Sequence, residues 1–317
     1  MTAQNELDAT AKGGTELLGD LLEKIVDPKL LEDVEIIRSR FRGFDLNKRY
    51  HIFWEHDLSD DPESRNVFSN QEIVNKLDAI VFVSYWQKNT FLERYPNIPK
   101  EKCVVILNAI DPIDINQRSN IDEKIRLIYT PTPHRGLEIL VPVFEALCNK
   151  FPNQLHLDVY SSFKLYGWET RDEPYRKLFD KIKNHPDMTY HGTVSNEEIR
   201  KALVRSDIFA YPSIWQETSC LCLIEAMSAG CQCVCSDLAA LPETSGGLIP
   251  MYSYTGNLNR DAQSFYSVLE ALIEYHKTTT SKEQLVFNKL YIDYLHNSTR
   301  MKLSWESLLT AVKGNNQ

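Results

Sequence analysis

The segment "DIFAYPSIWQETSCLCLIEAMSAGCQCVCSD" (207–237) places a helical pattern between two short apolar stretches. "DIFAYP" (207–212) and "CQCVCS" (231–236) each predict a buried strand, and "CLCLIEAMSAG" predicts a helix that ends at Gly230. A strand, a helix and a second strand in this order are typical of parallel sheets. The segment therefore predicts an α/β fold.

Short apolar, β-branched stretches recur along the rest of the chain and predict further strands. They lie at 34–37, 50–54, 79–84, 103–107, 125–130 and 155–160. Helical patterns such as "SYWQKNTFLERY" and "GLEILVPVFEALCNKF" follow two of them, and beyond residue 254 the pattern is helical to the end. The alternation predicts parallel sheets covered by helices.

A chain of 317 residues is long enough for two domains, each with its own core. The polar stretch "NQRSNIDEK" (116–124) interrupts the alternation and fits a linker. We expect domains over 1–120 and 121–295. A helix over 296–317 is expected to pack back on the first domain.

Composition and charge exclude several classes of protein. Hydrophobic residues make up 43% and charged residues 25%, as in folded soluble proteins. The N-terminus has no apolar signal segment and no stretch approaches the ~20 apolar residues of a membrane helix, so a cytoplasmic location is expected. The net charge of -9 disfavours nucleic acid as a partner.

Five of the seven cysteines lie in the segment 207–237. Cys231, Cys233 and Cys235 alternate along a strand and share one face, whereas Cys220 and Cys222 point to different sides of the helix. No CxxC spacing and no adjacent histidine is present, so no metal site is predicted. We expect these cysteines to be reduced and to pack in the core.

Glu217 and Glu225 stand eight positions apart in the same segment. Thr218 and Ser219 predict a helix start, which places Glu217 at or just before that start and Glu225 about two turns further on. Eight helical residues rise roughly 12 Å, more than the spacing between the two carboxyl groups of a glycoside hydrolase. We interpret them as contacts to two ends of one elongated ligand; the alternative is a capping carboxylate and a surface glutamate.

The stretch "PSIWQETSCLCLIEAMSAGCQCVCSDLAALPE" (212–243) resembles the E-x7-E segment of retaining glycosyltransferases of family 4. "AKGGTELLGDLLEKI", "AIVFVSYWQKNTF", "VVILNAIDP" and "HGTVSNEEIRKALVRSDIFAYPS" are similar to other parts of this family, and the chain looks most like its short phage-encoded members. The resemblance implies a GT-B fold: two Rossmann-like domains, for the acceptor and the nucleotide sugar, facing across a cleft. It implies a UDP- or GDP-sugar donor, retention at the anomeric carbon, and no metal or other cofactor.

The resemblance also assigns the donor site. It implies that Glu217 faces the transferred sugar, that Glu225 binds the ribose hydroxyls, and that Gly13 and Gly14 approach the diphosphate. The amides at the expected helix start, those of Thr218, Ser219, Cys220 and Leu221, suit an anionic or polyhydroxylated group.

Arg135 matches a basic residue that neutralises the leaving diphosphate in the family. A second basic residue is usual where this chain has Thr130, and Lys164 is a candidate to compensate for it. Gly192, in the segment that leads to the donor site, completes the expected donor-binding set. The chain also begins with polar "MTAQNELDAT" where the family has an apolar strand, so a reduced N-domain of about four strands is expected.

His56 and Asp57, in "FWEHDLSDDP", follow the second predicted strand. The resemblance places a histidine here beside the acceptor, where His56 would orient or deprotonate the acceptor hydroxyl, work that suits a near-neutral pKa. The alternative is a structural histidine. The catalytic candidates are therefore Glu217, His56 and Arg135.

The acceptor stays open among a glycan, a lipid, a protein and a modified DNA base, and the oligomeric state is not predicted. Two alternatives to a general glycosyltransferase remain. One is a phage glycosyltransferase that modifies DNA bases, and the other is a degenerate sugar-nucleotide-binding protein without turnover.

Overall fold

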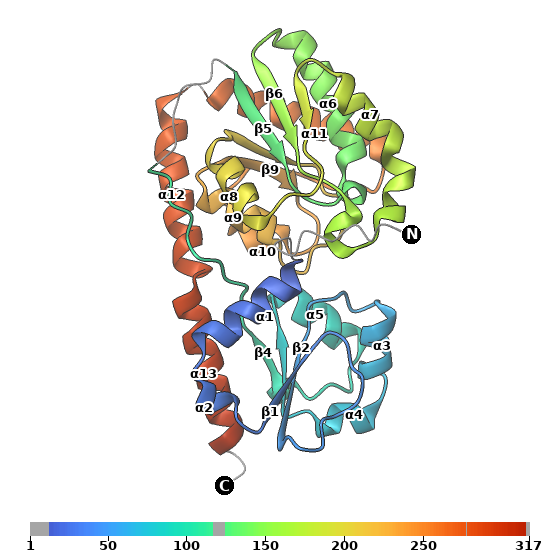
Figure 1. Ribbon diagram of the computed structural model, residues 1–317, viewed down its shortest axis with the longest axis vertical. Helices are drawn as coiled ribbons and strands as arrows, with labels where there is room; N and C mark the ends of the chain where they lie inside the picture. The colour runs from blue at the N-terminus through green and yellow to red at the C-terminus, as the bar shows by residue number, and fades with distance from the viewer. Residues whose placement is uncertain (1–12, 117–123, 277, 315–317) are drawn as a thin grey trace, which may run out of the picture. The chain divides into compact units, whose positions relative to one another are not determined.

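The computed structural model describes residues 13–116, 124–276 and 278–314 (Figure 1). These residues form two compact units. Of the described residues, the N-terminal unit holds 14–111, 216–221 and 295–314, and the C-terminal unit holds 13, 112–116, 124–215, 222–276 and 278–294. The linker predicted around residue 120 lies outside the described residues.

The N-terminal unit is built on a four-stranded parallel sheet in the order β1-β2-β3-β4. The strands are β1 (Val34–Arg38), β2 (Tyr50–Trp54), β3 (Ala79–Phe82) and β4 (Cys103–Val105). The helices are α1 (Gly14–Ile25), α2 (Pro28–Leu31), α3 (Pro62–Phe68), α4 (Gln71–Lys76), α5 (Tyr85–Arg94) and α13 (Ser298–Gly314), with the 3-10 turn η1 (Lys100–Lys102).

Both faces of this sheet are buried, because successive side chains of a strand point to opposite sides. Ile52 and Trp54 pack in one cluster with residues of α1 and α13, whereas Phe53 packs in a second cluster with residues of α3, α4 and α5. Trp305 of α13 meets Trp54 edge to face, with 4.9 Å between ring centroids. The last helix of the chain thus belongs to the N-terminal core.

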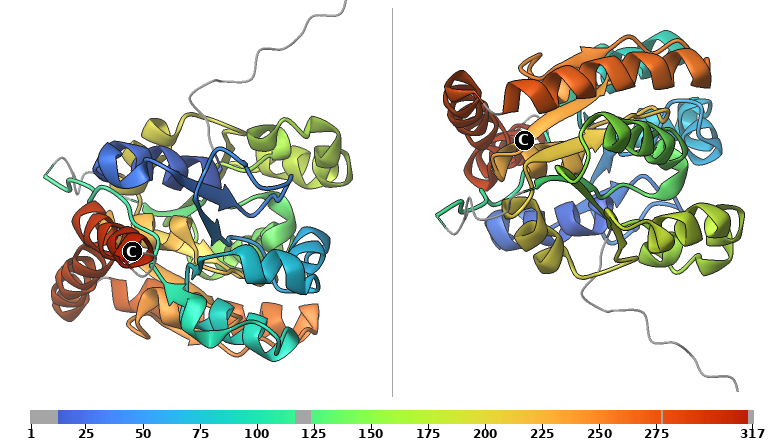
Figure 2. Two further views of the ribbon diagram at one scale, coloured as in Figure 1. Left: turned by 90° about the horizontal axis from the view of Figure 1, so that it is seen from below. Right: turned by 90° about the horizontal axis from the view of Figure 1, so that it is seen from above.

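The C-terminal unit is built on a six-stranded parallel sheet in the order β10-β9-β8-β5-β6-β7. The strands are β5 (Ile125–Tyr129), β6 (Leu155–Val159), β7 (Met188–Tyr190), β8 (Ile208–Tyr211), β9 (Gln232–Ser236) and β10 (Met251–Tyr252). The helices are α6 (Leu137–Lys150), α7 (Arg176–Asn184), α8 (Asn196–Val204), α9 (Leu221–Ser228), α10 (Leu241–Ser245), α11 (Leu258–His276) and α12 (Thr279–Leu295). The 3-10 segments are η2 (Pro133–Arg135), η3 (Phe163–Tyr166) and η4 (Glu169–Tyr175), and α6 packs beside α11 (Figure 2).

The predicted α/β class and all eight predicted strands are confirmed, with ends that differ by up to two residues. Strands β7 and β10 were not predicted, because their three and two residues offer too short an apolar run to recognise. The long C-terminal helical pattern breaks between α12 and α13. Here His296 Nδ1 lies 2.7 Å from the Asn108 carbonyl oxygen, and the Ile110 amide donates to the His296 carbonyl at 2.9 Å.

The cysteines of the segment 207–237 serve as packing residues. Cys231, Cys233 and Cys235 are buried on and beside β9, and Cys220 is buried before α9. Across the described ranges, no helix combines the length and apolarity that a membrane span needs.

Candidate functional site

The C-terminal sheet reverses its strand order between β5 and β8. From this pair the order continues through β6 to β7 on one side and through β9 to β10 on the other. Ligands of open α/β sheets bind beyond the carboxyl ends of the strands at such a reversal. The residues that follow β5 and β8 therefore occupy the expected place of a ligand in this unit.

Arg135 lies in this place, partly buried, at the end of η2. The Ile214 amide donates to the Arg135 carbonyl at 3.3 Å, and the Arg135 guanidinium carbon lies 5.8 Å from the centre of the Trp215 ring. The His134 ring packs edge-on against the same indole, with 4.8 Å between centroids. These contacts join the loops after β5 and β8 and position a cation between them.

Gly136 permits this junction. Its φ is +130°, and a Cβ at this position would lie 2.0 Å from the carbonyl oxygen of Pro212, a backbone atom. We expect Gly136→Ala to lower the free energy of unfolding by at least about 2 kcal/mol, measured by urea denaturation. Gly247→Ala is the matched control, because Gly247 also has a positive φ but open space around it. Equal losses in the two variants would contradict the close approach.

The chain enters α9 later than the sequence predicts. Because α9 begins at Leu221, the expectation that Glu217 starts this helix and that eight helical residues separate the two glutamates is wrong. The Thr218 hydroxyl donates to the His56 carbonyl at 2.8 Å, so the expected cap is used in a contact between distant segments. Of the four expected helix-start amides, only that of Leu221 lies in the helix, with Cys220 directly before it.

The two glutamates have different surroundings. Glu217 is buried, with 6% of its surface exposed, and lies in the segment Gln216–Leu221 of the N-terminal unit. Glu225 lies on α9 in the C-terminal unit, where Arg200 Nη1 binds its Oε1 at 3.0 Å. Burial raises the pKa of Glu225, and the Arg200 cation opposes this rise. The roles assigned to these glutamates remain predictions.

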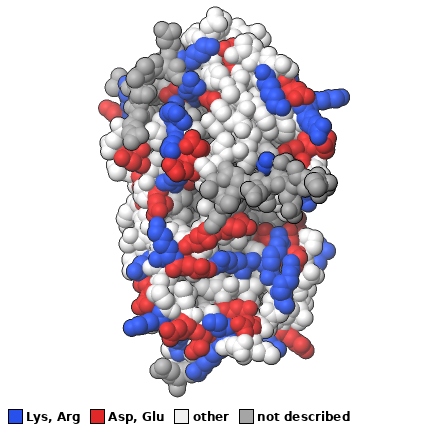
Figure 3. All heavy atoms as spheres, viewed as in Figure 1, with Lys and Arg blue, Asp and Glu red and all other residues white. Residues whose placement is uncertain are grey.

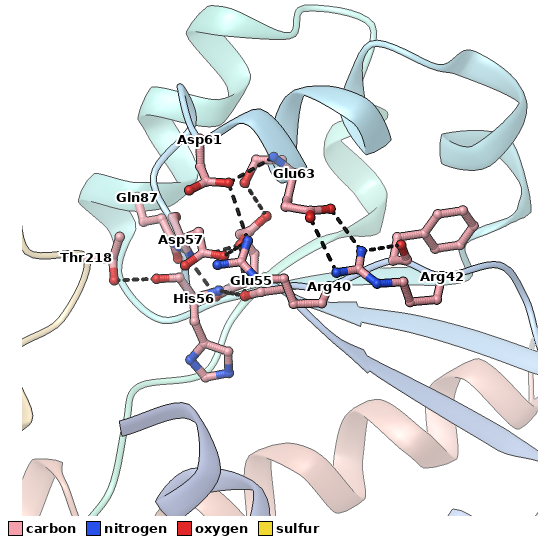
Figure 4. A network of polar contacts seen from close by, with 12 residues as sticks. Arg40, Arg42, Glu55, His56, Asp57, Asp61, Glu63, Gln87 and Thr218 are labelled. Atoms are coloured by element: carbon pink, nitrogen blue, oxygen red, sulfur yellow. Dashed lines mark hydrogen bonds and ion pairs between the residues drawn. The ribbon is translucent and has the colours of Figure 1, made fainter. Parts of the chain in front are cut away.

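The loop after β2 carries His56 and Asp57 and is held by a network of hydrogen bonds (Figure 4). The His56 amide donates to Ser39 Oγ at 2.8 Å, and its carbonyl accepts from Thr218. Gln87 Nε2 donates to the Asp57 carbonyl at 2.8 Å. The structure thus brings His56 together with a residue that follows Glu217, and both lie in the N-terminal unit.

Glu55, which was not among the predicted site residues, is the centre of this network. Its side chain is fully buried; Oε1 accepts from Ser39 Oγ at 3.1 Å and from the Asp57 amide at 2.8 Å, and Oε2 accepts from Ser64 Oγ at 3.1 Å. Burial raises the pKa of Glu55 to about 8. In the sequence, Glu55 could have been recognised as a carboxylate directly after a strand whose last residues are all apolar.

The His56 ring points away from these carboxylates in Figure 4 and lies 4.6 Å from the Trp54 ring, centre to centre. Its Nε2 is buried and has no hydrogen-bond partner among the residues that the structure describes. Burial, together with the Arg38 cation, lowers the pKa of His56 to about 3. So low a pKa does not suit the base role considered for His56, because an imidazole with this pKa is a weak base and is better suited to orient a hydroxyl than to take its proton.

The remaining donor candidates are spread over both units. Gly13 is buried directly before α1, and a Cβ on Gly14 would lie 3.1 Å from Leu221 Cδ1, so this glycine permits a close contact. Gly192 follows β7 with φ +67°.

Lys164 and Thr130, the two positions considered for a second basic residue, have different surroundings. Lys164 lies on η3, and its ammonium group binds Glu169 at 3.3 Å. Thr130 follows β5, and its hydroxyl is buried without a hydrogen-bond partner in the described ranges. Whether Lys164 compensates for Thr130 stays a prediction.

Comparisons with known proteins find similarity to glycosyltransferases. Residues 126–274 match the family model described as glycosyl transferases group 1. The chain is 27% identical over 207 residues to one component of human phosphatidylinositol N-acetylglucosaminyltransferase, covering 61% of this chain and 39% of the human protein. It therefore spans well under half the length of that relative.

Two solved structures share the fold. A glycosyltransferase from Rickettsia africae superposes with a TM-score of 0.70 at 16% identity, covering 99% of this chain and 84% of that one. The pneumococcal O-GlcNAc transferase GtfA, solved in complex with UDP and GlcNAc, superposes with a TM-score of 0.67 at 13% identity. The match covers 93% of this chain and 59% of that one. These comparisons confirm the GT-B fold and support a glycosyltransferase of the group 1 type.

Proposed function

We propose that the chain is a retaining glycosyltransferase of family 4 that moves a sugar from a UDP- or GDP-sugar to an acceptor hydroxyl, without a metal ion, in the cytoplasm. The observation that carries the proposal is the pairing of the loops after β5 and β8 at the strand-order reversal, with Arg135 between them. A guanidinium at this place suits the diphosphate of a nucleotide sugar. The UDP found in the pneumococcal structure supports a nucleotide of this kind.

Each candidate residue has a part in the proposed reaction. Arg135 stabilises the negative charge that develops on the leaving diphosphate. Glu217 faces the transferred sugar, and Glu225 binds the ribose hydroxyls. The neutral imidazole of His56 orients the acceptor hydroxyl, which attacks the face that the diphosphate leaves and gives its proton to the departing diphosphate oxygen.

A DNA base is a less suitable acceptor than a small hydroxyl compound. In the face drawn in Figure 3, acidic and basic side chains are interspersed, and the described residues there form no continuous basic stripe. The loop after β2 adds carboxylates at Asp57, Asp60 and Asp61, and the first turn of α3 adds Glu63. A phosphate backbone needs a basic groove, which this distribution does not favour.

The proposal is tested by a panel of UDP-, GDP- and ADP-sugars, read by thermal shift and by release of the nucleotide. One nucleotide class should raise the melting temperature, because a ligand that binds only the folded chain stabilises it. Nucleotide release should survive EDTA, and Arg135→Ala should weaken donor binding about tenfold. Arg176→Ala is the matched control, since Arg176 is an exposed arginine on α7. A panel without any shift or release would contradict the enzyme and favour a protein without turnover.

A further inference from the structure

A cavity of about 430 Å³ opens on the N-terminal unit between the loop after β2 and α5. We call it the Trp86 cavity. Its lining residues are Leu58, Ser59, Asp60, Trp86, Thr90, Glu93, Arg94 and Gln216. All of them belong to the N-terminal unit, and the volume is in the range of small-molecule sites.

Two residues of the lining stand close in the sequence to residues of the proposed reaction. Leu58 stands two residues after His56, and Gln216 stands directly before Glu217. The segments that carry these residues are joined by the hydrogen bond from Thr218 to the His56 carbonyl. The cavity and these two residues therefore share the loop after β2 and the segment Gln216–Leu221.

The wall of the cavity is held in place before any ligand binds. The Tyr95 hydroxyl donates to the Ser59 carbonyl at 2.7 Å, and Arg94 Nε lies 3.2 Å from Ser59 Oγ. Gln87, which is fully buried, fixes the adjacent Asp57 carbonyl. A preformed wall lowers the entropy cost of binding.

The lining combines an aromatic ring with several polar groups. Trp86 is partly buried and lines the cavity, and an indole ring suits the C–H face of a sugar ring. Carboxylates accept hydrogen bonds, a guanidinium donates them, and hydroxyl and amide groups do both, which matches the hydroxyls around such a ring. This is the mixture by which a protein recognises a carbohydrate.

The charges of the lining discriminate among carbohydrates. Asp60 and Glu93 are exposed carboxylates, and within the described part of the chain neither forms an ion pair. Arg94 is the one cation among the lining residues, and its Nε already contacts Ser59. Two carboxylates against one guanidinium repel a phosphorylated ligand and attract an amino group.

We propose that the Trp86 cavity binds the acceptor as a non-phosphorylated sugar ring, and that it favours one with an amino group. This inference rests on the proposed function, because it assumes that the hydroxyl to be glycosylated belongs to the compound in the cavity.

Binding is tested first, on the full chain without any donor. Methyl glycosides of a neutral hexose and of a 2-amino hexose, and the corresponding hexose phosphate, are compared by saturation-transfer NMR and titration. The expected order of affinity is amino sugar, neutral sugar, phosphorylated sugar. Trp86→Ala should weaken glycoside binding about tenfold, and Trp86→Phe should retain most of it. Glu93→Gln should reduce the preference for the amino sugar.

Tyr85→Ala is the matched control. Tyr85 is the preceding residue on α5, is 58% exposed, and does not line the cavity, so this variant should bind glycosides as the wild type does. Unchanged glycoside binding in Trp86→Ala, or strongest binding of the phosphorylated sugar, would overturn the proposal.

Measurements of turnover distinguish a failure of this proposal from a failure of the proposed function. With a donor that the nucleotide panel identifies, Trp86→Ala should raise the KM for the glycoside and should not weaken the binding of the donor. If glycosides bind but no donor does, the enzyme proposal fails and the acceptor role falls with it, while the cavity stands as a sugar-binding site. If donors are hydrolysed but glycosides do not bind, the cavity proposal fails alone.

Discussion

Glu217→Gln is expected to reduce sugar transfer about a hundred- to thousandfold, the usual loss when one preorganised electrostatic group is removed from a reacting centre. In the proposed reaction, positive charge develops on the transferred sugar as the diphosphate leaves. A carboxylate stabilises this charge and an amide of the same shape does not. Glu217 is buried, and a buried charge acts more strongly than an exposed one.

The measurement is kcat together with the dissociation constant of the donor. The loss should lie in kcat, whereas donor binding should change little, because the charge that Glu217 stabilises appears only in the transition state. Glu283→Gln, which changes an exposed glutamate of α12, should behave as wild type. A Glu217→Gln enzyme that transfers sugar at the wild-type rate would refute the role assigned to this carboxylate.

The strands were predictable because their signals are local. Short β-branched runs indicated eight strands. The start of α9 was not predictable, because the competitor for the Thr218 hydroxyl is the carbonyl of His56, 162 positions away. Sequence pattern carries capping propensity but not such distant partners.

The pKa of His56 illustrates a second limit. A histidine in a polar stretch such as "EHDLSDD" suggests a solvated group, yet the ring lies against Trp54 and its Nε2 is buried. Desolvation depends on which residues close around the side chain, and Arg38, which adds to the effect, comes from the neighbouring strand. Neither the desolvation nor the cation is visible in the sequence around position 56.

Glu55→Gln is expected to change how stability depends on pH. The pKa of Glu55 is raised from 4.5 to about 8 in the folded chain, so between these values the folded chain holds a proton that the unfolded chain releases. Stability from this group is therefore complete below pH 4.5 and is lost as pH rises through 8. Relative to the glutamine variant, the wild type should lose about 1.4 kcal/mol per pH unit inside this window.

Urea unfolding of both proteins at about pH 5, 6.5 and 8 measures this difference, in which groups common to both chains cancel. Glutamine occupies the same space, and the Ser39 and Ser64 hydroxyls can each donate or accept, so the variant should fold. Glu63→Gln is the matched control: Arg42 lowers the pKa of Glu63, so its contribution is lost only as pH falls below 4.5 and is constant in the tested range.

The free energy of unfolding of the wild type minus that of Glu63→Gln should therefore not change with pH over the tested range. The free energy of unfolding of the wild type minus that of Glu55→Gln should fall as pH rises. Parallel curves for wild type and Glu55→Gln would show that Glu55 is already ionised in the folded chain. A slope would mean that the loop with His56 and Asp57 is built around a neutral carboxylic acid at neutral pH. Because that acid binds the Asp57 amide and the Ser39 hydroxyl, which in turn holds the His56 amide, its ionisation acts on the backbone of both residues.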